Sequence, residues 1–440
     1  MREGSVRRLT GEEKKKCREL WEEIFTEDSE EFLDYYDRWK YTKNECYGIF
    51  DGDKLVSMVQ LNPYDMQFQP EGANRSRRLS SRYLVAVATK EEYRHRGMMK
   101  RLLKESLGAM REKGMPFVFL MPAAEAIYYP LGFRYFYESS TGTLDLPKKA
   151  GETALVIRQV KSSDLSEIVA FSEEVQGELF GCYTRRDRHY YEMLLAELKS
   201  EGGALLLLET SATDGQTEAD ERAYSKKGEA DGEAYPKKSE IDEEADSKRP
   251  GKKGRIVALV PYWGENPVEI REILCRPDDR ESVLLTLSIL FYGGQKTERE
   301  DFQKTETDRI SISGASFALE GKKPVIMGRI VDALSFLELF SADSPMEMIL
   351  ELSDGFLEEN SGLYRWSLSQ EGSRALRQDE MLQASELMGG KKGRDISAPE
   401  IVRVRYTVEE LFACLMGAGG PDGPLRSVRG CRNFYINEIV

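Results

Sequence analysis

Apolar residues in the first third of the chain recur first at helical and then at strand spacing. Cys17, Leu20 and Ile24 lie three or four positions apart, which predicts a helix over 12–25. Ser29, followed by two glutamates, predicts the start of a second helix that ends at Trp39. Short apolar runs between turn residues predict strands at 47–50, 55–61, 83–89 and 117–121, and a longer periodic segment predicts a helix at 97–112.

A second region repeats a similar order of elements. Its apolar runs predict strands at 154–158, 204–208, 255–260 and 269–275, a helix that begins at Ser163-Asp164-Leu165, and another at 281–291. A charged insertion at 210–254 interrupts this region and contains an 11-residue repeat, in which 218–228 is echoed by 229–239. Because the insertion has few apolar residues and two prolines, we expect a disordered loop without a catalytic role.

The last region changes pattern again. The apolar stretch 325–332 precedes a predicted helix at 334–340, strands are predicted at 348–352 and 364–368 on either side of a turn, and a final helix at 408–416. Mixed helices and strands throughout indicate an α/β (α+β) fold class. A length of 440 residues, at roughly 150 residues per domain, agrees with three domains, which we place at 1–148, 149–320 and 321–440.

Composition and charge narrow the classes of function. The formal net charge of −14 argues against a nucleic-acid partner, because binding to phosphate backbones requires a basic face. The same charge favours cationic substrates. Since the chain has only two histidines and no metal-ligand spacing of cysteines, we expect no metal.

The cysteines and the absence of a leader predict the compartment. Six scattered cysteines indicate buried free thiols in a reducing environment (Cys17, Cys46, Cys182, Cys275, Cys414 and Cys431). Neither a signal peptide nor an apolar run of membrane length is present in the sequence. We therefore expect a cytoplasmic protein that does not associate with membranes.

Candidate chemistry is concentrated in the turn Arg94-His95-Arg96-Gly97, between a predicted strand and a predicted helix. The first N–H groups of a helix have no partner within it, and the helix dipole leaves partial positive charge there. Gly97 allows the backbone to approach a ligand closely, and the arginines supply charge-assisted hydrogen bonds. The pattern predicts a pyrophosphate cradle. On these residues alone, an ordinary solvated basic turn explains the pattern equally well.

This turn resembles the acetyl-CoA loop of GNAT N-acetyltransferases, whose pattern is Arg/Gln-x-x-Gly-x-Gly/Ala. Arg94 and Gly97 match it, and Met99 departs from it. Over its whole length the chain resembles the Eis (enhanced intracellular survival) family of GNAT acetyltransferases. The segments that carry this resemblance are Val85–Thr89, Ile127–Phe133 and Phe434–Val440, together with Met327–Asp332, Asp354 and Asn360–Tyr364 of a sterol-carrier-like domain.

The resemblance implies tandem GNAT folds followed by the sterol-carrier-like domain. The second fold contains no arginine–glycine turn, which indicates a degenerate copy without a cofactor site. The resemblance also implies acetyl-CoA as donor, amine acceptors that include aminoglycosides and lysine side chains, and a hexamer. It assigns cofactor binding to Val85, Ala86, Val87, Arg94, His95, Arg96, Gly97, Met98, Met99, Lys100, Ala123 and Ala124.

For catalysis, the resemblance implies Tyr128 as general acid and the terminal carboxylate, here on Val440, as general base. A phenol with a pKa near 10 protonates a thiolate near 8.5 at a cost of about 2 kcal/mol, so Tyr128 acts better as a hydrogen-bond donor than as a full acid. An α-carboxyl near 3.5 facing an ammonium near 10.4 is uphill by about 9 kcal/mol, so the carboxylate orients the amine unless burial raises its pKa. Aromatic packing at Tyr128 and a closing strand at the C-terminus are the structural alternatives.

The leading hypothesis is an acetyl-CoA-dependent N-acetyltransferase for cationic small molecules such as aminoglycosides, active as a homo-oligomer. A protein lysine N-acetyltransferase is a second hypothesis. A third is not enzymatic: the last domain binds a lipid, and the first domain senses acetyl-CoA.

Overall fold

The computed structural model describes residues 4–73, 75–146, 154–211, 254–264, 267–292, 309–378, 402–417 and 419–437. The insertion predicted at 210–254, apart from its edges, lies outside the described residues, and so does Val440. The mixed α/β fold class is confirmed.

The chain forms two compact units. The first contains 1–139, 176–185 and 323–440, and the second contains 140–175 and 186–322. The division into three domains at 148 and 320 stays a prediction.

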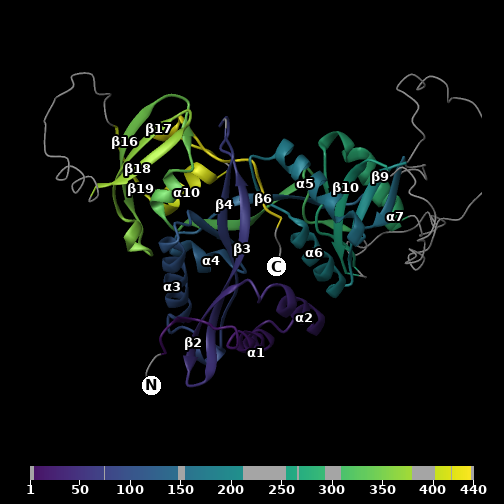
Figure 1. Cartoon of the computed structure of the whole chain (residues 1–440), viewed down its shortest axis with the longest axis horizontal. Helices are drawn as coiled ribbons and strands as arrows, with labels where there is room; N and C mark the ends of the chain where they lie inside the picture. Colours follow the sequence, from purple (N-terminus) through teal and green to yellow (C-terminus); the bar gives the residue numbers. More distant parts are fainter. Residues whose placement is uncertain are drawn as a thin grey trace, which may run out of the picture. The chain divides into compact units, whose positions relative to one another are not determined.

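The first unit is built on a mixed sheet in the order β1-β2-β3-β4-β5-β14-β6. β3 and β4 are much longer than the sequence predicted and run side by side (Figure 1). Their added halves pair in register from Asn62–Tyr83 to Phe68–Arg77, where polar side chains on one face hid the strand pattern. The strands are β1 (Arg7–Arg8), β2 (Glu45–Asp51), β3 (Lys54–Phe68), β4 (Arg77–Thr89), β5 (Phe117–Leu120), β14 (Gly321–Ile330) and β6 (Arg134–Thr143).

A strand from the last third of the chain completes this sheet. β14 lies between β5 and β6 and pairs antiparallel with β5, from Met327–Leu120 to Ile330–Phe117. Two short strands extend the other side: β8 (Cys182–Thr184) pairs with β3, and β21 (Phe434–Tyr435) pairs in parallel with β8. The first 140 residues therefore do not form the sheet alone.

Helices cover the first unit largely where the apolar periodicity predicted them. Ser29 accepts a hydrogen bond from the Phe32 amide at 3.1 Å, which confirms it as the N-cap of the second helix. Thr407 caps the last helix: its side chain accepts from the Glu410 amide, and the Glu410 side chain accepts from the Thr407 amide. The helices are α1 (Lys15–Ile24), α2 (Glu30–Trp39), α3 (Met98–Glu112), α4 (Glu125–Tyr128), α8 (Ala333–Leu337) and α10 (Val408–Met416).

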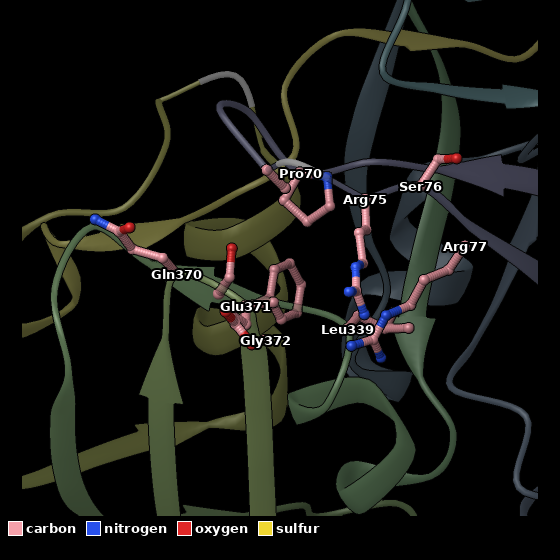
Figure 2. A pocket seen from close by; sticks show the side chains of 11 residues that line it. Pro70, Arg75, Ser76, Arg77, Leu339, Gln370, Glu371 and Gly372 are labelled. Atoms are coloured by element: carbon pink, nitrogen blue, oxygen red, sulfur yellow. The ribbon is translucent and has the colours of Figure 1, made fainter.

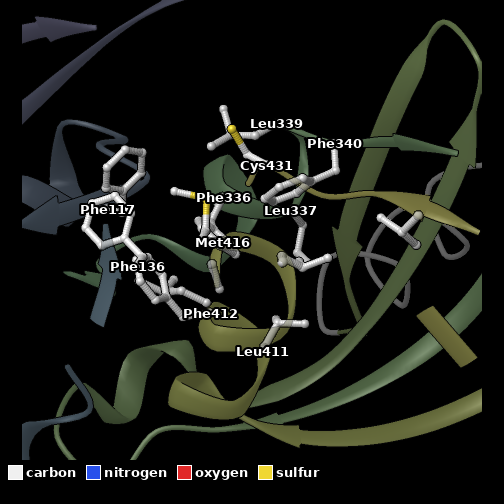
Figure 3. Packing of buried hydrophobic residues seen from close by; sticks show 14 of the residues in the cluster. Phe117, Phe136, Phe336, Leu337, Leu339, Phe340, Leu411, Phe412, Met416 and Cys431 are labelled. Atoms are coloured by element: carbon white, nitrogen blue, oxygen red, sulfur yellow. The ribbon is translucent and has the colours of Figure 1, made fainter. Parts of the chain in front are cut away.

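The C-terminal part of the first unit adds a four-stranded sheet in the order β18-β17-β16-β19 and a two-stranded ribbon. Its helices α8 and α10 pack against β5 and β6 through aromatic side chains (Figure 3). The Phe412 ring lies 5.5 Å from Phe136 and 5.8 Å from Phe336. The strands are β15 (Ser341–Ala342), β16 (Met346–Ser353), β17 (Gly362–Ser369), β18 (Gly372–Arg377), β19 (Val402–Thr407) and β20 (Val428–Arg429).

The strands of the second unit follow one another in the order β13-β11-β10-β9-β7, and the unit has its own apolar core. The strand predicted at 269–275 is divided into β11 and β12, and Arg271 between them forms a buried ion pair with Glu197. Its elements are β7 (Leu155–Gln159), α5 (Leu165–Leu179), α6 (Arg188–Ser200), β9 (Ala204–Thr210), β10 (Ile256–Trp263), β11 (Glu269–Ile270), β12 (Leu274–Cys275), α7 (Arg280–Tyr292) and β13 (Ser311–Ile312).

One sequence expectation is wrong. Cys182 and Cys431 form a disulfide within the first unit, although all six cysteines were expected to be free thiols. The two residues lie 249 positions apart, so spacing gave no sign of the pairing. Cys17, Cys46, Cys275 and Cys414 are free. Among the described residues, no helix is long and apolar enough to cross a membrane.

Candidate active site

The parallel strands β4 and β5 separate at the end where the predicted site lies. Among the residues described, their pairing is registered at Tyr83 and Phe119 alone. Beyond that pair, β4 continues to Thr89 while β5 ends at Leu120. Ligands of open α/β sheets bind where neighbouring strands diverge at their carboxyl ends, because backbone groups there are free of the ladder. The divergence makes 85–89 the edge of a candidate site.

A β-bulge distorts β4 at Ala86. The register with β3 shifts between Met58–Ala88 and Gln60–Val85, so that β4 carries an extra residue. Ala86 has φ +49°, in the left-handed region that residues with a Cβ seldom adopt. Bulges re-aim backbone groups beside functional sites, and backbone strain of this kind costs on the order of 1–3 kcal/mol. The predicted residues Val85, Ala86 and Val87 therefore lie on a strained segment at the separated edge.

The turn after β4 has the geometry of an anion cradle. A 3₁₀ turn at Glu91–Tyr93 leads into Arg94–Gly97, in which His95 has φ +62° and Gly97 has φ +72°. Left-handed residues in a turn bring neighbouring N–H groups together to form an anion-binding concavity. A Cβ added at Gly97 would meet no atom within 4 Å, so the space in front of the turn is open.

Helix α3 starts directly after Gly97 without neutralising its own dipole. No side chain caps its N-terminus, and its first turn has no acidic residue. Met98 is buried, Met99 packs against the same apolar cluster, and Lys100 is exposed. The side chain of Met99 therefore packs against the core. Although Met99 departs from the GNAT pattern, its side chain does not cover the backbone N–H groups of the turn.

The two arginines of the turn are exposed and bound to its carbonyl groups. Arg94 Nε donates to the Thr89 carbonyl oxygen at 3.2 Å, and Arg96 Nη2 donates to that of Glu92 at 2.6 Å. The Arg96 guanidinium also lies 5.1 Å from the Tyr93 ring centroid. Both charges are thus held beside the cradle, and an oxyanion there would gain charge-assisted hydrogen bonds.

Tyr128 ends the short helix α4 and is buried, with its ring 5.7 Å from that of Phe133. Burial raises the pKa of Tyr128 to about 12, because the phenolate would lose its hydration. The hydroxyl makes no hydrogen bond with the part of the chain that the structure describes. Tyr128 and Met98 belong to one apolar cluster, and Val87 and Met99 pack against it.

Ala123 and Ala124 follow β5 and are exposed, and Ala124 is the N-cap residue of α4. Three large apolar side chains near them are also exposed: Met121, Ile127 and Tyr129. Glu125, a weak alternative base by sequence, is exposed as well. This stretch forms an apolar rim beside Tyr128.

The described chain ends at Asn437, inside the first unit. Its side-chain oxygen accepts hydrogen bonds from Tyr137 Oη and Ser139 Oγ, each at 3.3 Å. These partners lie on β6, the strand that follows the Tyr128 turn. β21 is parallel to β8, β8 is antiparallel to β3, and β3 is antiparallel to β4, so the terminal strand runs in the direction of β4.

Sequence reasoning gave no role to Arg329, which contacts the Tyr128 turn. Its Nη1 donates to the Leu131 carbonyl oxygen, and its Nη2 pairs with Asp354 at 2.5 Å. The signal was available: an arginine within the apolar stretch 325–331 must find a buried partner.

A cavity of about 340 Å³ lies at the far end of β4 (Figure 2). Arg75 and Arg77 border it near the β3–β4 turn, and Gln370 and Glu371 border its other side. Eleven extended residues, about 36 Å, separate Arg77 from Ala88, so this cavity is not the cradle. In the described ranges, no group of three or more His, Cys, Asp or Glu side chains could hold a metal ion.

Separated parallel strands, a bulge in β4 and an uncapped helix after a left-handed turn form a site that suits an anionic ligand. Residues 5–136 match the protein family described as an acetyltransferase (GNAT) domain. This match to residues 5–136 supports an acyltransferase. GNAT domains use acetyl-CoA and an amine acceptor. No curated protein matches the chain by sequence.

Solved structures share the fold over nearly the whole chain. A conserved protein from Enterococcus faecalis V583, described as a probable N-acyltransferase, has a TM-score of 0.64 at 15% identity over 94% of this chain and 89% of its own. A GCN5-related N-acetyltransferase from Anabaena variabilis ATCC 29413 has a TM-score of 0.63 at 13% identity over 99% and 100%. Eis1 from Mycobacterium abscessus has a TM-score of 0.58 at 12% identity over 99% and 100%.

Proposed function

We propose that the protein transfers the acetyl group of acetyl-CoA to amines of cationic small molecules such as aminoglycosides. The observation that carries this proposal is the strand β4, with its bulge at Ala86 and the left-handed turn at His95 and Gly97 before α3. The backbone N–H groups of the turn and of Met98, Met99 and Lys100 hold the diphosphate. Arg94 and Arg96 add charge, and Ala123 and Ala124 border the pantetheine arm from the β5 side.

The edge of β4 and Tyr128 share the chemical step. A backbone N–H in the segment Val85–Val87 donates to the thioester carbonyl oxygen, and one such donor lowers the barrier by roughly 3–4 kcal/mol. Tyr128 donates a hydrogen bond to the departing sulfur. With a pKa of about 12, its full proton transfer to a thiolate near 8.5 is uphill by about 5 kcal/mol, so the stabilising hydrogen bond is its main contribution.

The terminal carboxylate of Val440 orients the attacking ammonium. The anchoring of Asn437 on β6 and the direction of β21 support this role. Three further residues reach at most about 10 Å from Asn437, so the anchor limits where the carboxylate is placed. The proton that the ammonium must lose before attack passes to water.

The net charge of −14 supports a cationic amine as the acceptor, because it favours the approach of cations. Three further features follow from the Eis resemblance: a degenerate second GNAT fold, a sterol-carrier-like third domain and a homo-hexamer. The cytoplasmic location is carried over from the sequence analysis, although the Cys182–Cys431 disulfide removes the free-thiol part of its basis. The apolar rim at Met121, Ile127 and Tyr129 offers a surface that a larger acceptor covers, which keeps lysine side chains of proteins as the second candidate acceptor.

The test is release of CoA thiol by the full chain with acetyl-CoA and a panel of aminoglycosides, polyamines and lysine-rich peptides. We expect turnover with at least one aminoglycoside. Turnover with peptides alone would assign the second acceptor class, and silence across the panel, with acetyl-CoA bound, would refute the proposal.

Two variants test the assigned groups. Tyr128→Phe should lower kcat about 100- to 1,000-fold and change the acetyl-CoA KM less than threefold, because one donor to the sulfur is lost. A short extension after Val440 should abolish most turnover, whereas the same extension before Met1 should not. Full activity of the C-terminally extended chain would remove Val440 from the mechanism.

A further inference from the structure

A buried guanidinium lies beneath the Tyr128 turn, on the strand that the last third of the chain inserts into the catalytic sheet. Arg329 is on β14, opposite Val118 of β5, and has no solvent exposure. Residues 5–136, which match the GNAT domain, do not include it. The family match therefore ends before a residue that touches the candidate acid's turn.

Every arm of this guanidinium has a partner that fixes it. Nη2 pairs with Asp354 at 2.5 Å, Nε donates to the Ile330 carbonyl oxygen at 3.0 Å, and Nη1 donates to that of Leu131. Asp354 is itself held, because its Oδ1 accepts from two backbone amides at 2.9 Å and its Oδ2 accepts from Asn360 Nδ2 at 3.0 Å. Asp354, which Asn360 and two backbone amides hold in place, therefore fixes the guanidinium from the C-terminal part of the first unit.

The carbonyl that Arg329 holds belongs to the turn that places Tyr128. Leu131 lies three residues after Tyr128, in a 3₁₀ turn that Gly132 ends with φ +81°. The Phe133 amide donates back to the Tyr128 carbonyl oxygen at 3.3 Å and closes the turn. A Cβ on Gly132 would lie 3.5 Å from Arg329 Nη1, so the turn rests directly on the guanidinium.

We propose that Arg329 is a positioning residue for Tyr128: through the Leu131 carbonyl it fixes where the phenol meets the departing sulfur. This inference rests on the proposed role of Tyr128. Lysine at 329 retains the charge for Asp354, but its single ammonium cannot reproduce the planar fork that spans Asp354 and Leu131. The acid's position in the first 140 residues is therefore set by a residue near the start of the last third.

The experiment compares Arg329→Lys with Arg186→Lys, which makes the same change in a buried ion pair of the second unit, Arg186–Glu272 at 2.9 Å. We expect Arg329→Lys to lower kcat about 10- to 100-fold, with the acetyl-CoA KM within threefold, and to speed hydrogen exchange of the 128–133 amides. Arg186→Lys should change neither quantity. In a Tyr128→Phe background, Arg329→Lys should cost less than threefold, because the group it positions is already gone.

The outcomes separate the two proposals. If Tyr128→Phe leaves kcat unchanged, the acid assignment fails whatever Arg329 does. If Tyr128→Phe slows turnover but Arg329→Lys leaves kcat unchanged, or costs the same factor in both backgrounds, Arg329 does not position Tyr128. If Arg329→Lys fails to fold, Asp354→Asn takes its place in the experiment, because asparagine retains the shape of aspartate and one acceptor oxygen. The same pattern is expected, with a smaller decrease in kcat.

Discussion

The two units contain the same sequence of strand, 3₁₀ turn and helix, and they differ where a phosphate would bind. In the first unit, four residues, Arg94 to Gly97, separate the 3₁₀ turn from α3. In the second unit, β12 is followed by a 3₁₀ turn at Pro277–Asp279, and α7 starts at the next residue, Arg280. No residue of the described stretch 274–292 has a positive φ. Between β12 and α7, nothing corresponds to the four-residue loop that forms the cradle in the first unit.

Charge reinforces this difference. Asp278 and Asp279 precede α7 and Glu281 lies in its first turn, whereas α3 has no acidic residue there. Carboxylates at a helix N-terminus neutralise the dipole that an external anion would use, and they repel that anion. An anion site in this arrangement needs both a left-handed loop and a helix start that no side chain occupies.

The largest expected contrast is the response of the units to reduction. Only the first unit contains the disulfide, Cys182–Cys431, among the described residues. Reduction should destabilise the first unit by about 2–4 kcal/mol, because the unfolded chain regains the freedom that the cross-link removed. Calorimetry with and without dithiothreitol checks this. The Cys182→Ser/Cys431→Ser double variant should be insensitive to reductant. If reductant leaves the unfolding transition of the first unit unchanged in the wild type, the prediction is contradicted.

The next contrast concerns glycine in the cradle. Gly97→Val should weaken acetyl-CoA binding about 5- to 30-fold, because holding a residue with a Cβ at φ +72° costs roughly 1–2 kcal/mol. Gly52→Val is the matched control: Gly52 has φ +60°, and a Cβ there also meets no atom within 4 Å, but it lies in the β2–β3 turn. Calorimetric titration measures both variants. Equal weakening in both would show that the strain acts on the fold and not on the cradle.

The smallest effect concerns pH. Burial raises the pKa of both Tyr128 and, in the second unit, Tyr191 to about 12, so the shift alone does not mark a catalytic tyrosine. Because the unfolded value is near 10, burial of the neutral phenol contributes full stability below pH 10 and loses it as the pH rises through about 12. We expect kcat to show no decline from Tyr128 ionisation up to pH 10. A falling limb near pH 10 that Tyr128→Phe abolishes would contradict this.

Local patterns predicted much of the secondary structure because their causes are local. Apolar spacing predicted α1 and α3, and the side chain of Ser29 caps α2 as expected. Local patterns predicted only part of the strained backbone at the site. Gly97 was expected to be permissive, but the left-handed conformations of Ala86 and His95 depend on pairing with β3 and on the following helix.

Long-range features were beyond the sequence because nothing local encodes them. The insertion of β14 between β5 and β6 joins residues about 200 positions apart. The disulfide and the contact from Arg329 to Leu131 have the same character. The roles of Tyr128, of Val440 and of the cofactor-binding residues stay predictions that the proposed variants address.

By itself, the sequence determined a basic glycine turn between a strand and a helix, because hydrogen-bonding geometry and charge at that point depend on neighbouring residues. The tertiary structure decided which of two similar helix starts stays open to an anion, how far β4 and β5 separate, and which distant arginine supports the Tyr128 turn. These properties arise from packing between segments that meet only after the chain has folded.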